Sequence, residues 1–332
     1  MPSPHDVSSA TVQLTDRRPD DFASVAVVIL TFNEEANLPA ALDSVKNWAT
    51  EIFVVDSYST DGTVDIALSR ADEGVHVVQH EFINYSDQWN WALNNLPISA
   101  EWTLKLDADE RVTMEFKAEC ERRLTDFPSE SHGVMFRRRL FFMDDPLSFG
   151  GVRSNYDLRM WRSGKARFED RAVNEHAIVE GNAETFASVV EHHDYKSLTD
   201  WLDKHNRYAS MEAITGLEGK LDGEIAPRLF GSPMERRCWM RRFAQRLPLR
   251  HVCHFLFRYF LQLGVLDGRA GFRYAFLHVA YIYWIDLKII EAKKRGRRPA
   301  VVFPQRGRPS PVVEQSAIQR QCDHSDAENL AA

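Results

Sequence analysis

Residues 104–112 read LKLDADERV, an apolar run that ends in four charged residues within five positions. Only Ala108 separates Asp107 from Asp109. Two carboxylates at this spacing can approach one divalent cation, and Mg²⁺ and Mn²⁺ prefer such oxygen ligands together with phosphate oxygens. A cation held here would offset the repulsion between these carboxylates and a diphosphate, and it would stabilise a diphosphate leaving group. The pattern therefore predicts a site for Mn²⁺ or Mg²⁺ and a phosphate-bearing ligand.

Two further polar clusters follow runs that are typical of buried strands. VAVVIL at 25–30 leads into TFNEE, and EIFVVDS at 51–57 leads into a turn that contains STDG. Continuous β-branched runs of this kind indicate strands covered on both faces. Ligands of open parallel sheets bind beyond the carboxyl ends of the strands. We therefore expect the three clusters to meet at one edge of a sheet.

Strand and helix patterns alternate through the first third of the chain. Strands are predicted at 25–30, 51–57, 75–80 and 101–110, with helices between them that begin near residue 38, at an N-cap formed by Ser59 or Thr60, and at Ser86. Such alternation predicts an α/β fold with a mostly parallel, Rossmann-like sheet flanked by helices. Short strand-like pieces follow from 133 to 191, and an amphipathic helix begins at 198. No glycine-rich phosphate loop is present.

The composition is that of a globular protein, with 332 residues, 44% of them hydrophobic and 27% charged. The four cysteines (Cys120, Cys238, Cys253 and Cys322) are scattered, which predicts a reducing compartment rather than disulfides or a zinc site. The first residues lack the basic start and apolar run of a secretory signal. We expect a disordered tail at 1–24, a catalytic domain at 25–225, a helical extension at 226–298 and a second disordered tail at 299–332.

Charge is segregated along the chain. The formal net charge is -7, yet residues 228–298 contain sixteen Lys or Arg against four acidic residues. The same stretch is rich in aromatic residues, and its longest uncharged run, 274–285, is short of the roughly 20 residues that span a bilayer. The pattern predicts that 226–298 lies on a membrane surface of anionic lipid. Packing of the aromatic stripe on the catalytic domain or on another copy is the alternative, and no nucleic-acid-binding module is evident.

Four segments together resemble a known enzyme family: VVILTFNEEANL, FVVDSYSTDGT, WTLKLDADERV and FEDRAVNEHAIVEG. They are similar to the family 2 glycosyltransferases of the GT-A fold, and the similarity is greatest to the bacterial branch of lipopolysaccharide core β-glucosyltransferases. The resemblance runs from about Val25 to Lys294 and includes HNRYASMEA and LGVLDGRAGF.

The resemblance implies roles for individual residues. Thr31, Asn33 and Glu34 match the first nucleotide-binding loop, and Asp56 matches the acid that contacts the base or ribose of a sugar nucleotide. Asp107 and Asp109 match the metal motif, Glu175 matches the general base, and His192 matches a histidine near the metal or diphosphate. Arg269, within DGRAGF, is the candidate phosphate contact. The alternatives are a structural ion pair for Glu175 and a packing role for His192.

Two positions depart from the family pattern. Asn174 stands where the branch usually has His, and Trp89 stands where Lys or Arg is common. The first departure removes a neighbouring imidazole, and the second predicts altered contacts with the donor or the acceptor.

The expected activity is that of an inverting, metal-dependent glycosyltransferase. The resemblance implies transfer of a hexose from a UDP-sugar to a cell-envelope glycan or glycolipid such as lipopolysaccharide core, at the cytoplasmic face of the inner membrane. Two alternatives remain: an acceptor that is a polyprenyl-linked or capsule intermediate, and a non-catalytic membrane-docking protein that keeps a nucleotide-binding fold.

Overall fold

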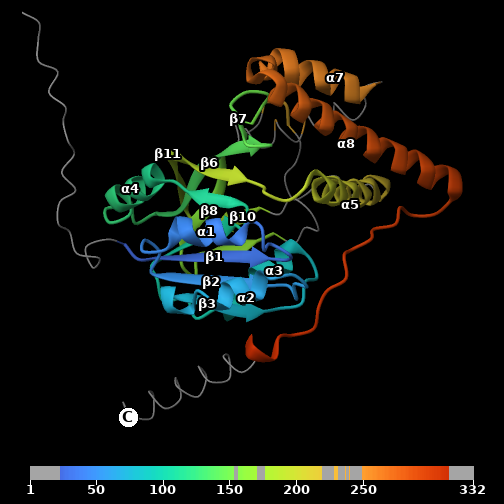
Figure 1. Ribbon diagram of the computed structural model, residues 1–332. Coiled ribbons are helices and arrows are strands. Elements are labelled where there is room, and N and C mark those ends of the chain that lie inside the picture. The colour runs from blue at the N-terminus through green and yellow to red at the C-terminus, as the bar shows by residue number, and fades with distance from the viewer. Residues whose placement is uncertain are drawn as a thin grey trace, which may run out of the picture.

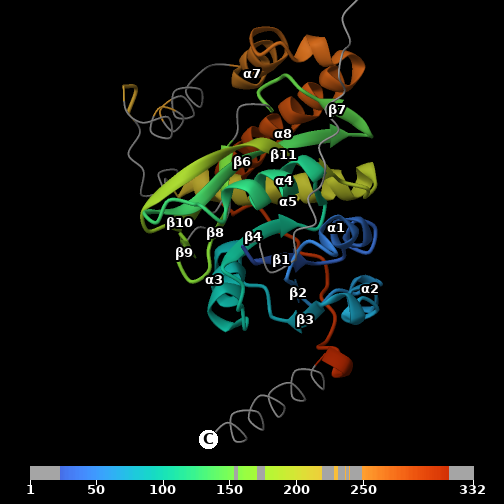
Figure 2. The same cartoon turned by 90° about the vertical axis from the view of Figure 1, so that its left-hand side faces the viewer.

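The computed structural model describes residues 23–152, 156–169, 176–218, 228–230, 236, 239 and 249–313. Within these residues nine strands form one mixed sheet, in the order β3-β2-β1-β4-β8-β6-β11-β5, with β7 paired to β6. A separate two-stranded sheet pairs β9 (Ala166–Phe168) with β10 (Ala177–Val179). Helices lie on both faces of the large sheet, and a group of C-terminal helices lies beyond one of its sides (Figures 1 and 2).

The first half of the sheet is parallel, as predicted. It consists of β1 (Val25–Thr31), β2 (Glu51–Asp56), β3 (Val75–Gln79) and β4 (Trp102–Asp107). Thr31 pairs with Asp56 across β1 and β2, and Leu30 pairs with Asp107 across β1 and β4. This register places the carboxyl ends of three strands side by side.

The second half departs from the predicted, mostly parallel sheet. Its strands are β5 (Glu110–Val112), β6 (Ser131–Phe142), β7 (Asp145–Leu147), β8 (Tyr156–Arg162) and β11 (Asn182–His193). β8 is antiparallel to both β4 and β6, and β5 is antiparallel to β11, whereas β6 and β11 are parallel. The connection from β6 to β8 contains β7, which pairs antiparallel with β6, and its described residues include no helix that could carry the crossover that parallel neighbours require. The sheet is therefore mixed.

Two apolar layers cover the sheet because β1 is buried on both faces. Val25, Val27 and Ile29 pack toward α1 (Leu38–Val45), α2 (Thr63–Leu68) and α4 (Met114–Arg123). Ala26 and Val28 pack in the other layer, with α3 (Tyr85–Asn95). Trp89 of α3 is 1% exposed and stacks on Phe168, so this departure from the family pattern is part of the core.

The helix starts differ in detail from the sequence prediction. Asn84, rather than Ser86, caps α3, because its side chain accepts a hydrogen bond from the amide of Asp87. Gly62 precedes α2, so neither Ser59 nor Thr60 is its N-cap. The helix predicted from residue 198 is α5 (Leu198–Leu217), and Ser197 and Asp200 form a capping box at its start.

The C-terminal helices are α7 (Arg250–Leu256), the π-helical turn η3 (Phe257–Leu261), the 3₁₀ turn η4 (Gly264–Asp267) and α8 (Gly268–Arg295). α8 packs along α5. None of the described helices combines the length and the apolar character that a bilayer crossing requires.

After α8 the chain returns to the sheet in an extended segment (Figure 1). Val313, near its end, is 3% exposed and belongs to the same core cluster as β1. Residues 299–313 are therefore ordered, contrary to the prediction of a disordered tail. The buried side chain of Val313 and the hydrogen bonds of Arg306 and Ser310 hold this segment against the sheet. Residues 314–332 lie outside the described residues.

Candidate active site

The loops that follow β1 and β2 are hydrogen-bonded to each other. Asn33 adopts a left-handed backbone (φ 55°), its amide donates to Ser59 Oγ at 2.8 Å, and its side-chain oxygen accepts from the Thr60 amide at 2.8 Å. The Glu34 amide donates to Thr63 Oγ1 at 2.7 Å. The two predicted nucleotide-binding loops therefore form one unit, and Ser59 and Thr60 bind the first loop rather than capping a helix.

Asp56 lies at the centre of this unit and is fully buried. Its carboxylate accepts hydrogen bonds from Thr31 Oγ1 at 3.1 Å, the Ser59 amide at 2.9 Å and Gln79 Nε2 at 2.8 Å. The structure therefore brings Thr31 and Asp56 together as predicted. It also shows that both carboxylate oxygens already have donors from the protein.

Asp107 is bound mainly to arginine. Its Oδ2 accepts from Arg159 Nη2 at 2.7 Å, and Arg159 Nη1 donates to Glu110 Oε1 at 2.6 Å. Arg159 is 4% exposed and Glu110 is fully buried, so this is an interior ion-pair network, which Arg138 extends at 3.4 Å from Glu110. Burial by itself would raise the pKa of Asp107, but the positive charges of Arg159, Lys105 and Arg138 together outweigh burial and hold that pKa well below its usual range. Burial raises the pKa of Glu110.

Asp109 has a different environment. β11 lies beside β5, the backbone carbonyl of Asp109 accepts from the His193 amide at 2.7 Å, and His192 Nδ1 lies 3.4 Å from Asp109 Oδ1. Both of these atoms are buried, and neither has a hydrogen-bond partner among the described residues. An unpartnered carboxylate oxygen next to an unpartnered imidazole nitrogen is the ligand type that Mn²⁺ accepts.

The described residues offer a cation a pair of unpartnered ligand atoms rather than a closed cage. Among the described residues there is no group of three or more His, Cys, Asp or Glu that could hold an ion. Mg²⁺ and Mn²⁺ sites commonly use one or two carboxylates and take the remaining ligands from substrate phosphates and water. Asp109 and His192 fit such a site, while Oδ2 of Asp107 is occupied by Arg159.

Two lysines near this pair were missed by sequence reasoning. Lys204 Nζ lies 4.0 Å from Asp109 Oδ2, and Lys196 Nζ lies 2.6 Å from Glu34 Oε1. Burial alone would lower the pKa of the Lys204 ammonium, but the acidic groups around it, with Asp109 the strongest of them, together outweigh burial and raise that pKa. Burial raises the pKa of Glu34, although Lys196 opposes the shift. The capping box at Ser197 was the available signal, because it starts α5 directly after β11 and so places Lys204 near the sheet edge.

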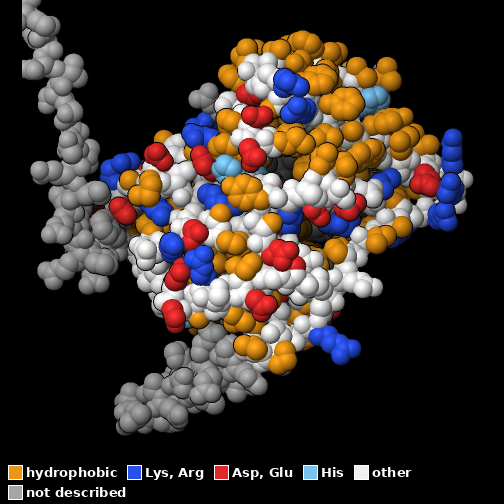
Figure 3. All heavy atoms as spheres, viewed as in Figure 1, with side chains coloured by type: hydrophobic (Ala, Val, Ile, Leu, Met, Phe, Trp, Pro, Cys, Tyr) orange, Lys and Arg blue, Asp and Glu red, His pale blue; other side chains and the backbone are white. Residues whose placement is uncertain are grey.

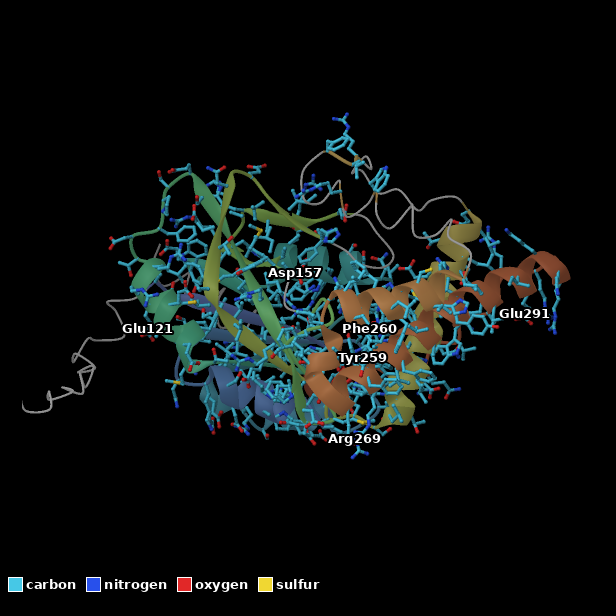
Figure 4. All side chains as sticks on the ribbon, turned by 90° about the horizontal axis from the view of Figure 1, so that it is seen from above. Glu121, Asp157, Tyr259, Phe260, Arg269 and Glu291 are labelled. Atoms are coloured by element: carbon cyan, nitrogen blue, oxygen red, sulfur yellow. The ribbon has the colours of Figure 1, made fainter. Side chains whose placement is uncertain are left out.

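Two predicted site residues do not join this group. Glu175 belongs to 170–175, which lies outside the described residues. Arg269 is exposed in the first turn of α8 and lies at the outer edge of the molecule (Figure 4). The residues that do meet are Thr31, Asn33, Glu34 and Asp56 on one side, and Asp107, Asp109 and His192 on the other. Glu34 and Lys204 link the two sides, since each interacts electrostatically with Asp109.

The sequence comparisons identify the family to which the first part of this chain belongs. Residues 26–163 match the family model for glycosyl transferase family 2. Those residues therefore form a family 2 glycosyltransferase domain, and the protein is a glycosyltransferase.

Individual relatives were also found. The lipopolysaccharide core biosynthesis glycosyltransferase LpsC of Rhizobium meliloti is 28% identical over 263 residues, which cover 78% of this chain and 92% of LpsC. An uncharacterised glycosyltransferase of Rickettsia typhi is 27% identical over 57% of this chain and 66% of its own length. The crystal structure of S. aureus TarS 1-349 in complex with UDP gives a TM-score of 0.40 at 14% identity, over 82% of this chain and 92% of that one. A structural likeness at that level says nothing of the ligands of this chain.

Proposed function

We propose that this protein is an inverting, metal-dependent hexosyltransferase that uses a UDP-sugar to extend a cell-envelope glycan such as lipopolysaccharide core. The observation that carries the proposal is the unpartnered Asp109–His192 pair, at the same sheet edge as the buried Asp56 network. The name of the relative LpsC supports a lipopolysaccharide core acceptor. A GT-A fold supports the same proposal, because the sugar-nucleotide site of that fold lies at the sheet edge that here carries Asp56 and Asp109.

The proposed reaction needs a cation site, positive charge near the diphosphate and a general base. Asp109 and His192 would hold Mn²⁺ or Mg²⁺, which neutralises the diphosphate leaving group when it is bound. Lys204 and Lys196 add positive charge at the same edge. Glu175 accepts the proton of the acceptor hydroxyl as its oxygen attacks the anomeric carbon, and the bond from that carbon to the diphosphate breaks on the opposite face.

The test is a donor screen on the purified protein, with release of the nucleoside diphosphate as the readout. UDP-sugars are expected to release UDP in the presence of Mn²⁺ or Mg²⁺ and deep-rough lipopolysaccharide. Lipid-linked acceptors and capsule repeat units, assayed in parallel, identify the acceptor class. Failure of every donor to release its nucleotide with every acceptor would refute the proposed activity.

Glu175→Gln should leave UDP binding unchanged and lower the transfer rate by about 100- to 10,000-fold, because the amide cannot accept the acceptor proton. Isothermal titration with UDP and the rate of product formation measure the two effects separately. Normal transfer by the Gln variant would exclude Glu175 as the base. Glu180→Gln, an exposed change in the turn after β10, is the matched control.

We also propose that the C-terminal helices bind the cytoplasmic face of the inner membrane. Figure 3 shows hydrophobic side chains gathered over α7 and α8. Leu261 is 75% exposed, Leu266 61%, Phe276 58% and Phe260 53%, an unusual exposure for side chains of this size. Lys293, Lys294 and Arg295 close α8 and would interact with anionic headgroups.

The double change Phe260→Ser with Leu261→Ser should weaken binding to vesicles of phosphatidylcholine and phosphatidylglycerol by about 100-fold. Each apolar side chain that enters the acyl boundary contributes roughly 1.5–3 kcal/mol. Vesicle co-sedimentation measures the change, with Ile83→Ser as an exposed control elsewhere. Equal binding by the wild type and the double variant would exclude this surface as the docking face.

A further inference from the structure

The loop after β7 is fastened to the turn before α8. The side chain of Asp267 accepts hydrogen bonds from the amides of Ser148 and Phe149 at 3.0 and 2.9 Å. The amide of Gly150 donates to the carbonyl of Gln262 at 2.8 Å. The C-terminal helices are therefore held to the catalytic sheet at a fixed position, by contacts that come from the LGVLDGRAGF stretch.

Glycines allow the close approach inside this contact. A Cβ at Gly271 would lie 2.2 Å from the carbonyl oxygen of Gly264, and a Cβ at Gly264 would lie 2.9 Å from the carbonyl oxygen of Arg258. A side chain at Gly271 would push η4 away from α8, and a side chain at Gly264 would push η4 away from η3. The LGVLDGRAGF stretch thus forms one wall of the space between the C-terminal helices and the sheet.

A cavity of about 240 Å³ lies there, and its lining includes Arg138, Val152, His192, Arg258 and Tyr274. Small-molecule sites commonly enclose roughly 300–1,000 Å³, so this smaller space suits a ligand of about one saccharide unit rather than a longer chain. His192 belongs both to this lining and to the pair with Asp109. The cavity is therefore next to the proposed site of transfer.

The two arginines of the cavity differ in their partners. Arg138 is paired with Asp157 at 3.1 Å and with Glu110 at 3.4 Å. Arg258 donates through Nε to the carbonyl of Gly150 at 2.8 Å, and its guanidinium lies 5.4 Å from the centre of the Tyr274 ring. In the described part of the chain no carboxylate lies within ion-pair distance of Arg258.

We propose that this cavity is the acceptor subsite, that it takes a saccharide unit bearing a phosphate or a carboxylate, and that Arg258 binds this anionic group. The inference rests on the proposed function, because it names the class of acceptor. Arg258 has no acidic partner among the described residues and lies at the wall of a cavity beside the transfer site, so it suits a planar oxyanion, and the Tyr274 ring supplies an apolar surface for a sugar face. Arg258 replaces Arg269 as the arginine through which the C-terminal helices contact the substrate.

The test compares acceptors with and without their anionic groups. Deep-rough lipopolysaccharide is used as isolated, after dephosphorylation, and after reduction of its carboxylates. Arg258→Ala is expected to raise KM for the intact acceptor by about 10- to 100-fold, as loss of a charged hydrogen bond predicts, with a smaller change in kcat. Removing the group that Arg258 binds should raise the wild-type KM to the same degree and should leave the variant unaffected.

Control variants separate binding from folding. Arg258→Lys should recover part of the affinity, and Val152→Phe should block the cavity without changing its charge. Arg139→Ala is the matched control, because Arg139 alternates with Arg138 and Leu140 on β6 and pairs with Glu191 instead. An unchanged KM in Arg258→Ala, or equal sensitivity of wild type and variant to removal of every anionic group, would overturn the inference.

If the wild type transfers no sugar, the proposed function fails, but the acceptor subsite can still be tested by itself. In that case, ligand-observed NMR measures the binding of mannose 6-phosphate, glucuronate and mannose. This measurement tests the anionic subsite independently of sugar transfer. The two anions should bind more tightly than mannose to the wild type and lose this preference in Arg258→Ala. Equal binding of all three sugars by the wild type would overturn the subsite.

A second inference rests on different contacts. The segment 304–313, which we call the strap, crosses the edge of the sheet at the Asp56 network. Arg306 Nη1 donates to the carbonyl of Ser57 at 2.7 Å, and its guanidinium lies 4.4 Å from the ring centre of Phe32 and 4.7 Å from that of Phe82. A planar cation thus lies against two aromatic rings.

The rest of the strap engages the hydrogen-bonding groups of the same edge. The Gly307 amide donates to the carbonyl of Tyr58 at 2.8 Å, and the Ser310 amide donates to Gln79 Oε1 at 2.6 Å. Gln79 in turn donates to Asp56. A Cβ at Gly307 would lie 3.0 Å from the carbonyl oxygen of Ser59 and 3.3 Å from that of Tyr58, so a larger side chain would loosen this contact.

We infer that the strap occupies the position of the donor's nucleobase and competes with the nucleotide. This rests on the proposed donor site at Asp56, where the strap already uses the acceptors and aromatic faces that a planar base would need. Opening of the strap then precedes binding of the donor.

Arg306→Ala and Gly307→Val, each in the full chain, should each lower the Kd for UDP by about tenfold, as measured by isothermal titration. Arg308→Ala, an exposed neighbour, should leave that Kd at the wild-type value. A weaker or unchanged affinity of Arg306→Ala for UDP would overturn the inference that the strap competes with the nucleotide. It would show instead that the strap forms part of the binding site. Absence of UDP binding in all variants, including wild type, would instead refute the donor assignment.

Discussion

Asp109→Asn should remove most Mn²⁺ binding and lower kcat by at least about 100-fold. Asp109 Oδ1 and His192 Nδ1 are buried 3.4 Å apart, and neither atom has a hydrogen-bond partner among the described residues, so both are available to a cation. A metal contributes several kcal/mol to stabilising the charge of a leaving diphosphate. An amide in place of the carboxylate removes the negative charge but keeps the shape of the side chain.

Electron paramagnetic resonance of free Mn²⁺ measures binding without turnover, and UDP release measures the rate. His192→Ala should weaken Mn²⁺ binding by a smaller factor, because it removes one neutral ligand. Asp126→Asn, on the exposed segment after α4, should match the wild type in both assays. Full Mn²⁺ affinity in Asp109→Asn would show that the metal lies elsewhere.

Arg159→Met should destabilise the fold by about 3–5 kcal/mol. The guanidinium is 4% exposed and joins Asp107 at 2.7 Å to the fully buried Glu110 at 2.6 Å. Removing one partner of a buried ion pair leaves the other charges uncompensated in the interior. Urea unfolding, followed by intrinsic fluorescence, gives the free energy of unfolding.

A double variant separates charge from packing. Glu110→Gln combined with Arg159→Met should recover part of the stability that Arg159→Met loses, because the buried negative charge is then absent. Arg139→Met, which breaks an exposed pair with Glu191, should change stability by less than about 1 kcal/mol. A loss in Arg159→Met as small as that of Arg139→Met would contradict a structural role for the network.

These two predictions assign different functions to neighbouring acids in LDADE. Asp107 and Glu110 bind Arg159 and fix the end of β4, whereas Asp109 faces His192. The network therefore orients the loop so that one carboxylate remains available to a ligand. A sequence motif with two aspartates does not by itself reveal this division.

Local pattern determined much of the fold. The runs at 25–30 and 51–57 became β1 and β2, because a strand buried on both faces is apolar at most positions, and 75–80 became the edge strand β3. Parallel pairing then placed Thr31, Asp56 and Asp107 at one edge. Convergence of the acidic clusters was predictable for this reason.

Tertiary structure alone decided the partners of these residues. Arg159 reaches Asp107 over 52 positions, Asn37 contacts Asp194 over 157, and Arg306 contacts Ser57 over 249. No periodicity or local motif encodes such pairs, because they depend on how the second half of the sheet and the C-terminal segment fold back. The sequence by itself pointed to Asp56, Asp109 and His192 as candidates, whereas Lys196, Lys204 and Arg258 emerged only from the structure. Only the packing of distant segments decided that Asp109 stays free of arginine, that Arg258 rather than Arg269 lines the cavity, and that the strap covers Asp56.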